Sequence, residues 1–561
     1  MKVALVAPPY PLEEIPSPPL GICYAAAACE AAGADVRIFD YIVGCYTPEN
    51  LKTAMDAFQP DIIGATSVTL NFPVAAAILK TAKQHRPEVV TMMGGPHVSF
   101  DAEAVLRENP DIDVVFIGEA ENSLAQWLPL YADRSAWASV KGISFKVDDA
   151  VLTTGFGECV RDLDKLPLPA RHLLPISRYH ALGFPVSIIT SRGCPHQCIF
   201  CLGRRMVGSR VRFRSAVRVA DEIATLLALG FTRINIADDL FPASKKRVRA
   251  FCDEIIRRGL CFTWSAFARV DTVSEDVLGL MRRAGCDAVS FGIESGNPEM
   301  LKRIKKGITL DQARHAVSLC RKVGMLAHAS FMVGLPGETV ETLRDSLSFA
   351  AELDIAHGYH FLAPFPGTAI REHIDDYDLE ILTDDWSRYD ANRAIVRTAA
   401  LAPEQMNAFV DEAYRPIYEE FDALKQRCRE GNGAAEEWLQ ATASDRLNLV
   451  FDILSNNLIE SLGHIPGDTG DPVRELIRRI SGATHYDETF VDRYIRDWTA
   501  RGYLAFSTEN GRSRWFWTEN GIPAVPVSGV SAIVNRGAGD MAGKKDRALE
   551  NICNAESIME A

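Results

Sequence analysis

Three cysteines lie close together in the middle of the chain, at positions 194, 198 and 201. The spacing C-x3-C-x2-C lets three thiolates wrap one cubane iron–sulfur cluster, because each sulfur can bind a different iron. Only three thiolates are offered, so one iron stays open for a small-molecule ligand. A closed structural zinc site would need His196 as its fourth ligand and spaces its cysteines differently. The sequence therefore predicts a [4Fe–4S] cluster on Cys194, Cys198 and Cys201.

The segment around these cysteines alternates apolar strand candidates with helices, from residue 185 to about residue 371. The strand candidates are residues 186–190, 233–237, 262–268, 288–292, 328–333 and 359–363. Helices are expected to begin near residues 217, 244, 274, 310 and 340. Six strands joined by five crossovers predict a partial (β/α)6 barrel of the TIM type, with an open mouth at the carboxyl ends of its strands. The cysteine loop follows the first of these strands.

A C-x3-C-x-aromatic-C motif directly after a first barrel strand resembles the radical S-adenosylmethionine (AdoMet) superfamily. The resemblance implies that the open iron chelates the amino and carboxylate groups of AdoMet, and that reduction yields a 5′-deoxyadenosyl radical. Phe200 would lie beside the adenine. Later strand ends would bind the rest of AdoMet through Asp238, Arg269 and Glu294, near its amine, its carboxylate and its ribose respectively. The Gly-Gly-Glu form that is usual after the second strand is absent here.

The first 150 residues also alternate strand candidates with helices. Strands are expected at residues 2–7, 36–39, 62–67, 89–93 and 114–117, with helices at 20–32 and 74–84. This pattern predicts an α/β domain with a Rossmann-like, doubly wound parallel sheet. Ligands of such sheets lie at the carboxyl ends of the strands.

The arrangement through about residue 400 resembles the class B radical AdoMet enzymes with an N-terminal cobalamin (B12)-binding domain. The resemblance implies that loops at the strand ends contact cobalamin through Ser67, Thr69, Gly94, Gly95, His97, Gly118 and Glu119. The D-x-H-x-x-G motif, whose histidine binds cobalt in many cobalamin proteins, is absent. His97 is the remaining candidate cobalt ligand, and contact with the corrin edge or with nothing is its other interpretation.

The other parts of the chain carry weaker signals. Residues 151–184, with prolines at 167 and 169, are expected to connect the two domains, which span residues 1–150 and 185–371. Residues 372–523 are expected to form a mainly helical region that caps the barrel mouth, with a helix and hairpin at 494–517. Residues 524–561 are rich in Gly, Ser, Ala and charge, which predicts a disordered tail.

The composition excludes several classes of protein. A net charge of −14 argues against a large nucleic-acid interface. No apolar run approaches the roughly 18 residues of a membrane span, and Pro8 and Pro9 interrupt the N-terminus too early for a signal peptide. We therefore expect a cytoplasmic protein. The resemblance adds anaerobic chemistry, a small-molecule or natural-product substrate, and an electron donor such as flavodoxin or ferredoxin.

The resemblance implies a cobalamin-dependent methyltransferase that acts on an unactivated carbon or a phosphinate phosphorus. One AdoMet would methylate cob(I)alamin, and a second would form the 5′-deoxyadenosyl radical that activates the substrate to take the methyl from methylcobalamin. A cyclase or rearrangement enzyme similar to the anaerobic magnesium-protoporphyrin ester cyclase would use the same cofactors without methyl transfer. A further alternative is a cofactor-binding protein whose radical site is inactive. The three intact cysteines disfavour this alternative.

A methylthiotransferase would need a second cluster near the N-terminus, for which Cys23, Cys29 and Cys45 are the candidates. Cys23 and Cys29 lie six positions apart in one predicted helix and so point to different faces. The C-terminal RNA-binding β-barrel of that family is also missing from the pattern. Both observations disfavour this alternative.

Overall fold

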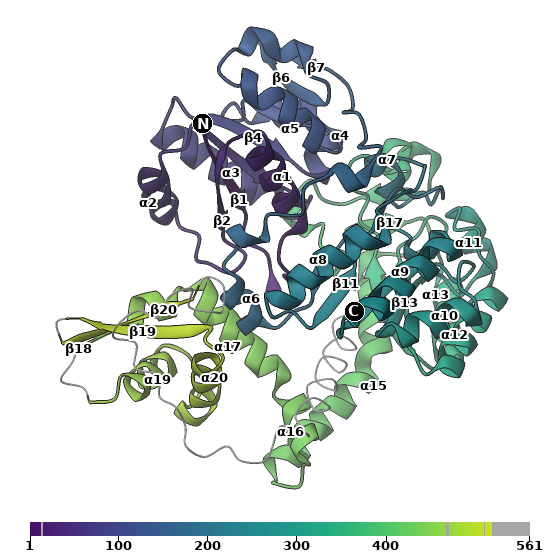
Figure 1. The fold of residues 1–561 in the computed structure, drawn as a ribbon. Coiled ribbons are helices and arrows are strands. Elements are labelled where there is room, and N and C mark those ends of the chain that lie inside the picture. Colours follow the sequence, from purple (N-terminus) through teal and green to yellow (C-terminus); the bar gives the residue numbers. More distant parts are fainter. Residues whose placement is uncertain (13–14, 467–469, 510, 519–561) are drawn as a thin grey trace.

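The computed structural model describes residues 1–12, 15–466, 470–509 and 511–518. It consists of an N-terminal mixed sheet, a central parallel sheet and a C-terminal unit (Figure 1). The tail predicted at residues 524–561 lies outside the described residues.

The N-terminal sheet has seven strands in the order β2-β1-β3-β4-β5-β6-β7. Its strands are β1 (Lys2–Ala7), β2 (Asp35–Asp40), β3 (Ile62–Thr66), β4 (Val90–Gly94), β5 (Val114–Phe116), β6 (Ile143–Val147) and β7 (Ala150–Thr153). The first five pair in parallel, which confirms the predicted Rossmann-like sheet. The antiparallel strands β6 and β7 were not predicted. Most of β7 is exposed, so its sequence lacks the apolar signal of a buried strand.

Helices cover both faces of this sheet. They are α1 (Leu20–Ala31), α2 (Pro48–Phe58), α3 (Phe72–His85), α4 (Pro96–Glu108) and α5 (Glu121–Trp127). Along β1, Val3 and Leu5 pack with α1 and α5, whereas Ala4 and Val6 pack with the other three helices. Both faces are therefore buried, which is typical of parallel strands and explains why β1 is apolar from Val3 to Ala7.

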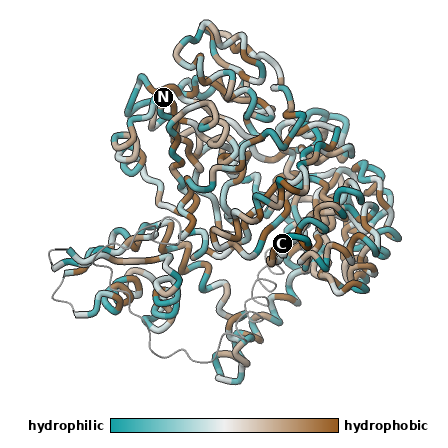
Figure 2. Tube along the Cα trace, in the orientation of Figure 1, coloured by the Kyte–Doolittle hydropathy of each residue, from teal (hydrophilic) through white to brown (hydrophobic). Residues whose placement is uncertain are grey.

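The central sheet is an open barrel with the strand order β15-β14-β13-β12-β11-β8, all parallel. Its strands are β8 (Val186–Ile188), β11 (Arg233–Ile236), β12 (Thr263–Ala268), β13 (Cys286–Glu294), β14 (Leu326–Val333) and β15 (Ala356–Phe361). The helices outside it are α8 (Ala216–Ala228), α9 (Lys245–Arg258), α10 (Glu275–Arg283), α11 (Pro298–Arg303), α12 (Leu310–Val323) and α13 (Val340–Leu353). The predicted six-stranded partial barrel is confirmed. Brown apolar segments mark the strands of both sheets in Figure 2, and teal residues lie mainly on the outer helices.

Short elements connect these parts. They are α6 (Ile176–Leu182), β9 (Ser191–Arg192), α7 (Gly203–Val207), β10 (Arg212–Phe213), α14 (Ala369–Glu372), β16 (Leu379–Ile381) and β17 (Val396–Thr398). The segment with β16 and β17 packs at the carboxyl end of the barrel, where the Thr398 hydroxyl donates to the Glu338 carbonyl. No helix within the described ranges combines the length and the apolar character needed to cross a bilayer.

The C-terminal unit begins with α15 (Pro403–Arg429) and continues through α16 (Ala435–Ala441), α17 (Ala443–Ser455), α18 (Leu458–Leu462), β18 (His464–Pro466), α19 (Pro472–Ala483), α20 (Glu488–Ala500), β19 (Leu504–Glu509) and β20 (Arg512–Trp517). The strands pair in the order β18-β20-β19. The helix and hairpin expected at residues 494–517 are confirmed by α20, β19 and β20. With the helices they form the arrangement of a winged-helix unit.

The expectation that the C-terminal region caps the barrel mouth is wrong for the described residues from 435 onward. Tyr494 and Trp498 of α20 line a cavity together with Phe231 and Gly285, which precede β11 and β13. The unit therefore packs at the amino ends of the barrel strands, opposite the mouth. The cause is the length of α15, whose 27 residues span about 40 Å and carry the chain from one end of the barrel to the other (Figure 1).

Candidate active site

The three predicted cluster cysteines lie in one loop between β9 and α7. Backbone hydrogen bonds hold this loop in place: the Cys194 amide donates to the Gly208 carbonyl at 3.1 Å, and the Ile199 amide to the Ile304 carbonyl at 3.2 Å. Gly193 adopts φ +110°, and a Cβ there would lie 2.4 Å from the Arg210 carbonyl oxygen. Only glycine satisfies both constraints, so the turn into the cysteine loop depends on it.

The chemistry of this loop fits an iron–sulfur cluster. Burial raises the pKa of the Cys194, Cys198 and Cys201 thiols, for Cys201 to about 11, while the positive charges of Arg269 and Lys306 oppose the rise at Cys194 and Cys198. Nowhere in the described residues do three His, Cys, Asp or Glu side chains already form a metal-ready group. Binding of a cluster would remove the protons of these thiols, as metal binding by cysteine generally does. Three soft donors on one loop are what a cubane cluster with an open iron requires.

The predicted AdoMet contacts lie around the carboxyl ends of the barrel strands. Phe200 is half-buried and packs against the main core. Arg269 follows β12 and makes two 3.0 Å contacts with the carboxylate of Asp271. Glu294 ends β13 with φ +72° and accepts a 2.6 Å hydrogen bond from the Lys306 ammonium.

Lys306 was missed by the sequence analysis. It is buried, and its charge acts on two of the cluster cysteines. Its place directly before Gly307, in the loop between α11 and α12, is the one feature of the sequence that could have drawn attention to it. The sequence does not show that this lysine pairs with Glu294, because the two residues meet only after folding.

The two aspartates after β11 have different surroundings. The Asp238 carboxylate is buried and accepts from the Thr190 amide at 2.6 Å and from the Thr190 and Ser191 hydroxyls at 2.5 Å each. It therefore holds the strand that leads into the cluster loop. Asp239 instead lines a cavity between the N-terminal sheet and the elements that flank the cluster loop. The predicted AdoMet contact was Asp238, yet Asp239 is the member of the pair that faces free space.

The predicted cobalamin loops gather at the carboxyl edge of the N-terminal sheet. Gly95 has φ +115°, and a Cβ there would lie 2.2 Å from the Ser67 carbonyl oxygen, so the two loops touch through their backbones. Gly118 has φ +80°, and its amide donates a 3.0 Å hydrogen bond to the Ser99 hydroxyl oxygen. These glycines allow neighbouring strand ends to form one smooth wall.

Four of the seven predicted cobalamin contacts line a common cavity: Gly94, Gly95, Gly118 and Glu119. The other three, Ser67, Thr69 and His97, are buried behind that wall. The His97 ring stacks on Phe72 at 4.2 Å and meets the edge of Trp386 at 4.9 Å. Its Nδ1 lies 3.4 Å from the Thr69 hydroxyl, and burial lowers its pKa to about 4. In this structure the His97 ring therefore packs against Phe72 and Trp386.

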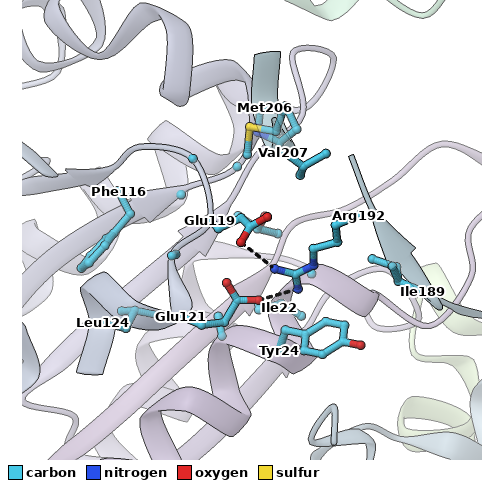
Figure 3. A pocket seen from close by; sticks show the side chains of 18 of the residues that line it. Ile22, Tyr24, Phe116, Glu119, Glu121, Leu124, Ile189, Arg192, Met206 and Val207 are labelled. Carbon is cyan, nitrogen blue, oxygen red and sulfur yellow. Dashed lines mark hydrogen bonds and ion pairs between the residues drawn. The ribbon is translucent and has the colours of Figure 1, made fainter. Parts of the chain in front are cut away.

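The cavity lies between the N-terminal sheet and the cluster loop. It contains about 1300 Å³ of free space, including the part that opens to solvent. One wall comes from the N-terminal loops and α1, and the opposite wall from β9, α7 and the residues after β11. Figure 3 shows mostly apolar side chains around a buried group of charges formed by Glu119, Glu121 and Arg192. The cavity thus lies between the cobalamin loops and the two elements, β9 and α7, that flank the cluster loop.

The cysteines of the methylthiotransferase alternative do not face this cavity. Cys23 and Cys29 are buried in α1, and burial raises the pKa of each thiol to about 12. Their neighbours Ile22, Tyr24 and Ala25 form the lining instead. A second cluster on these thiols would require the helix to be rebuilt.

Two family models match the chain. Residues 15–128 match the B12 binding domain, and residues 188–350 match the radical SAM superfamily. An uncharacterised methyltransferase of Pyrococcus horikoshii is 34% identical over 426 residues, covering 74% of this chain and 92% of that protein. The anaerobic magnesium-protoporphyrin IX monomethyl ester cyclase of Cereibacter sphaeroides is 31% identical over 417 residues, covering 72% of this chain and 67% of that protein.

A solved structure shares the fold. The cobalamin-dependent S-adenosylmethionine radical enzyme OxsB, with aqua-cobalamin and S-adenosylmethionine bound, superposes with a TM-score of 0.64 at 17% identity, over 89% of this chain and 78% of that chain. The resemblance stated from the cysteine motif and the strand-end loops is confirmed. The chain belongs to the radical S-adenosylmethionine enzymes with an N-terminal B12-binding domain, whose cofactors are a [4Fe–4S] cluster, S-adenosylmethionine and cobalamin.

Proposed function

We propose that the chain is a methyltransferase that acts on a carbon or phosphinate centre too unreactive for direct attack on AdoMet. The observation that carries the proposal is the shared cavity, because the cobalamin loops form one wall and the elements on either side of the cluster loop, β9 and α7, form the opposite wall. When bound, the cluster and AdoMet supply a radical, and cobalamin supplies a methyl group. The task of the protein is to hold these groups at fixed positions and to exclude water and oxygen.

The cluster and AdoMet would be held at the mouth of the barrel. Cys194, Cys198 and Cys201 bind three irons, and Phe200 lies beside the adenine. Arg269 offers its guanidinium to the AdoMet carboxylate. Its bidentate contact with Asp271 fixes the plane of that guanidinium before AdoMet arrives.

The remaining AdoMet contacts come from neighbouring strand ends. Glu294 accepts from the ribose hydroxyls while Lys306 holds its carboxylate at 2.6 Å. Asp239 takes the place near the AdoMet amine, since it faces the cavity and Asp238 is occupied by Thr190 and Ser191. Asp238 then acts indirectly: it does not contact AdoMet but fixes the strand that precedes the cluster cysteines.

Cobalamin would lie against the wall formed by Gly94, Gly95 and Gly118, which has no side chains to hold a flat ring away. The apolar side chains of Met92, Phe116 and Met206 suit the edge of a corrin. Ser67, Thr69 and His97 support this wall from behind. We do not assign a cobalt ligand to His97, because its ring is enclosed by Phe72 and Trp386.

A cyclase remains the second candidate, because a magnesium-protoporphyrin ester cyclase is 31% identical to the chain. Methyl transfer is preferred because the Pyrococcus horikoshii protein, which is named a methyltransferase, has the greater sequence identity, 34%, and is covered over 92% of its length. The substrate is a small molecule in either case. We further propose a flavodoxin or ferredoxin as electron donor and the cytoplasm as the compartment.

The experiment uses anaerobically reconstituted protein with AdoMet that carries a deuterated methyl group, under a strong reductant. Methyl donation releases S-adenosylhomocysteine, whereas radical formation releases 5′-deoxyadenosine, so the two co-products report the two uses of AdoMet separately. We expect both, with deuterated methyl found on any small molecule that serves as substrate. Formation of 5′-deoxyadenosine without S-adenosylhomocysteine would reject methyl transfer and favour the cyclase.

A further inference from the structure

A buried group of four charges connects the two halves of the cavity. Arg192 lies on β9, two residues before Cys194, and its guanidinium contacts Glu121 at 2.6 Å and Glu119 at 3.4 Å. Glu119 lies in the loop after β5 of the N-terminal sheet, and Glu121 begins α5, which follows that loop. Figure 3 shows Arg192 between the two carboxylates, with the Tyr24 ring beside it; the guanidinium lies 5.1 Å from the centre of that ring.

A second arginine completes the group. Arg212 lies on β10, directly opposite Arg192 in the β9–β10 ladder, and pairs with both oxygens of Glu119. The Val160 amide also donates to Glu119 at 2.8 Å. Two glutamates and two arginines give a neutral group, and none of the four side chains is more than 11% exposed. We call this group the Arg192 bridge.

Stability alone does not account for such a group. Taking four charges out of water costs about as much as their attraction returns, so apolar residues of similar size would stabilise the interior as well or better. What a buried, fully paired charge group does provide is a single allowed geometry. A shift of the N-terminal loop relative to β9 would leave charges unpaired, at several kcal/mol per ion.

The position of the Arg192 bridge gives this geometry a function. Glu119 follows Gly118 in the wall assigned to cobalamin, and Arg192 leads through Gly193 into the cluster loop. Resting on the proposed function, we infer that the bridge is a positioning device that fixes the separation of the cobalamin site and the cluster loop. Arg192 acts through the loops that it joins and is not a ligand of either cofactor.

Methyl donation depends on this separation, because AdoMet held at the cluster must present its methyl group to the cobalamin site. Formation of 5′-deoxyadenosine depends on the cluster loop and on the AdoMet contacts of the barrel, but not on the cobalamin site. The bridge therefore governs the ratio of S-adenosylhomocysteine to 5′-deoxyadenosine, and this ratio can be measured without knowing the substrate. A misplacement of about 1 Å can cost a factor of up to about a hundred in rate.

The test compares Arg192→Gln with Arg171→Gln. Arg171 forms a 2.6 Å pair with Glu222 that is just as buried but does not line the cavity, so its loss controls for breaking any buried pair. We expect Arg192→Gln to retain iron and cobalamin while the ratio of S-adenosylhomocysteine to 5′-deoxyadenosine falls at least about tenfold. Arg171→Gln should leave the ratio unchanged. Glu121→Gln, which keeps the Glu119–Arg212 pair, should lower the ratio too and serves if Arg192→Gln fails to fold.

Hydrogen exchange of the cofactor-free protein provides a second readout. The amides of residues 118–122 and 191–194 should exchange faster together in Arg192→Gln and remain protected in Arg171→Gln. An unchanged ratio, a parallel fall of both co-products or a loss of cobalamin alone would each overturn the inference. If the wild type forms no S-adenosylhomocysteine, the proposed function fails, whereas the hydrogen exchange result still decides whether the two loops are coupled.

Discussion

At the scale of single residues, the adjacent carboxylates of Asp238 and Asp239 should have separable effects. Asp238→Asn replaces one oxygen of a buried acceptor for Thr190 and Ser191, so it should cost about 1–3 kcal/mol and lower the iron content after reconstitution. Asp239→Asn changes a side chain on the cavity wall and should keep the iron while weakening AdoMet binding about tenfold. Iron analysis and equilibrium binding of AdoMet test both variants. Normal iron content in Asp238→Asn, or unchanged AdoMet affinity in Asp239→Asn, would contradict these roles.

The sequence predicted single residues where chemistry and spacing occur together. Cys194, Cys198 and Cys201 were identified because their spacing within one loop already defines a ligand set. Lys306 and Asp239 were not assigned, because their roles depend on which way a side chain turns and on partners brought close only by folding. The contact between Arg192 and Glu121 spans 71 positions, and no local pattern encodes it.

At the scale of elements, the loop between β4 and α4 should respond differently to two neighbouring substitutions. Gly95→Ala places a methyl group 2.2 Å from the Ser67 carbonyl oxygen at φ +115°, so it should destabilise the domain by about 3 kcal/mol. A methyl group at Gly94 meets only Phe116 Cβ, at 3.9 Å, and otherwise extends from the cavity wall. Gly94→Ala should therefore fold normally but bind cobalamin more weakly. Thermal unfolding and cobalamin titration check the pair, and wild-type cobalamin affinity in Gly94→Ala would argue against a corrin on this wall.

The parallel strands of both sheets were predictable, because apolar strand candidates recur along their sequences. Of the helices on the N-terminal sheet, only α1 and α3 were predicted, and α2, α4 and α5 were not. The strands β6 and β7 were not, since their pairing depends on an edge of the sheet that exists only after folding. The same holds for the small sheet in which β18 pairs with β20, across the whole of α19 and α20.

At the scale of the whole molecule, the sequence identified the parts but not their arrangement. The carboxyl edges of the two parallel sheets face one cavity, and buried charges join them across it. The winged-helix unit lies at the opposite end of the barrel, because α15 carries the chain past the barrel wall. The relative placement of domains depends on contacts between distant residues, such as Arg178 with Glu460 at 2.6 Å, which are invisible in a single sequence.

The most direct test of the central claim is the metal content of the full chain, purified and reconstituted without oxygen in the presence of hydroxocobalamin. We predict about four irons and about one cobalt per chain. The variant with Cys194, Cys198 and Cys201 all changed to Ala should lose the iron and keep the cobalt, since the B12-binding wall is built by other loops. About four irons with no cobalt in the wild type would contradict a cavity shared by the two cofactors.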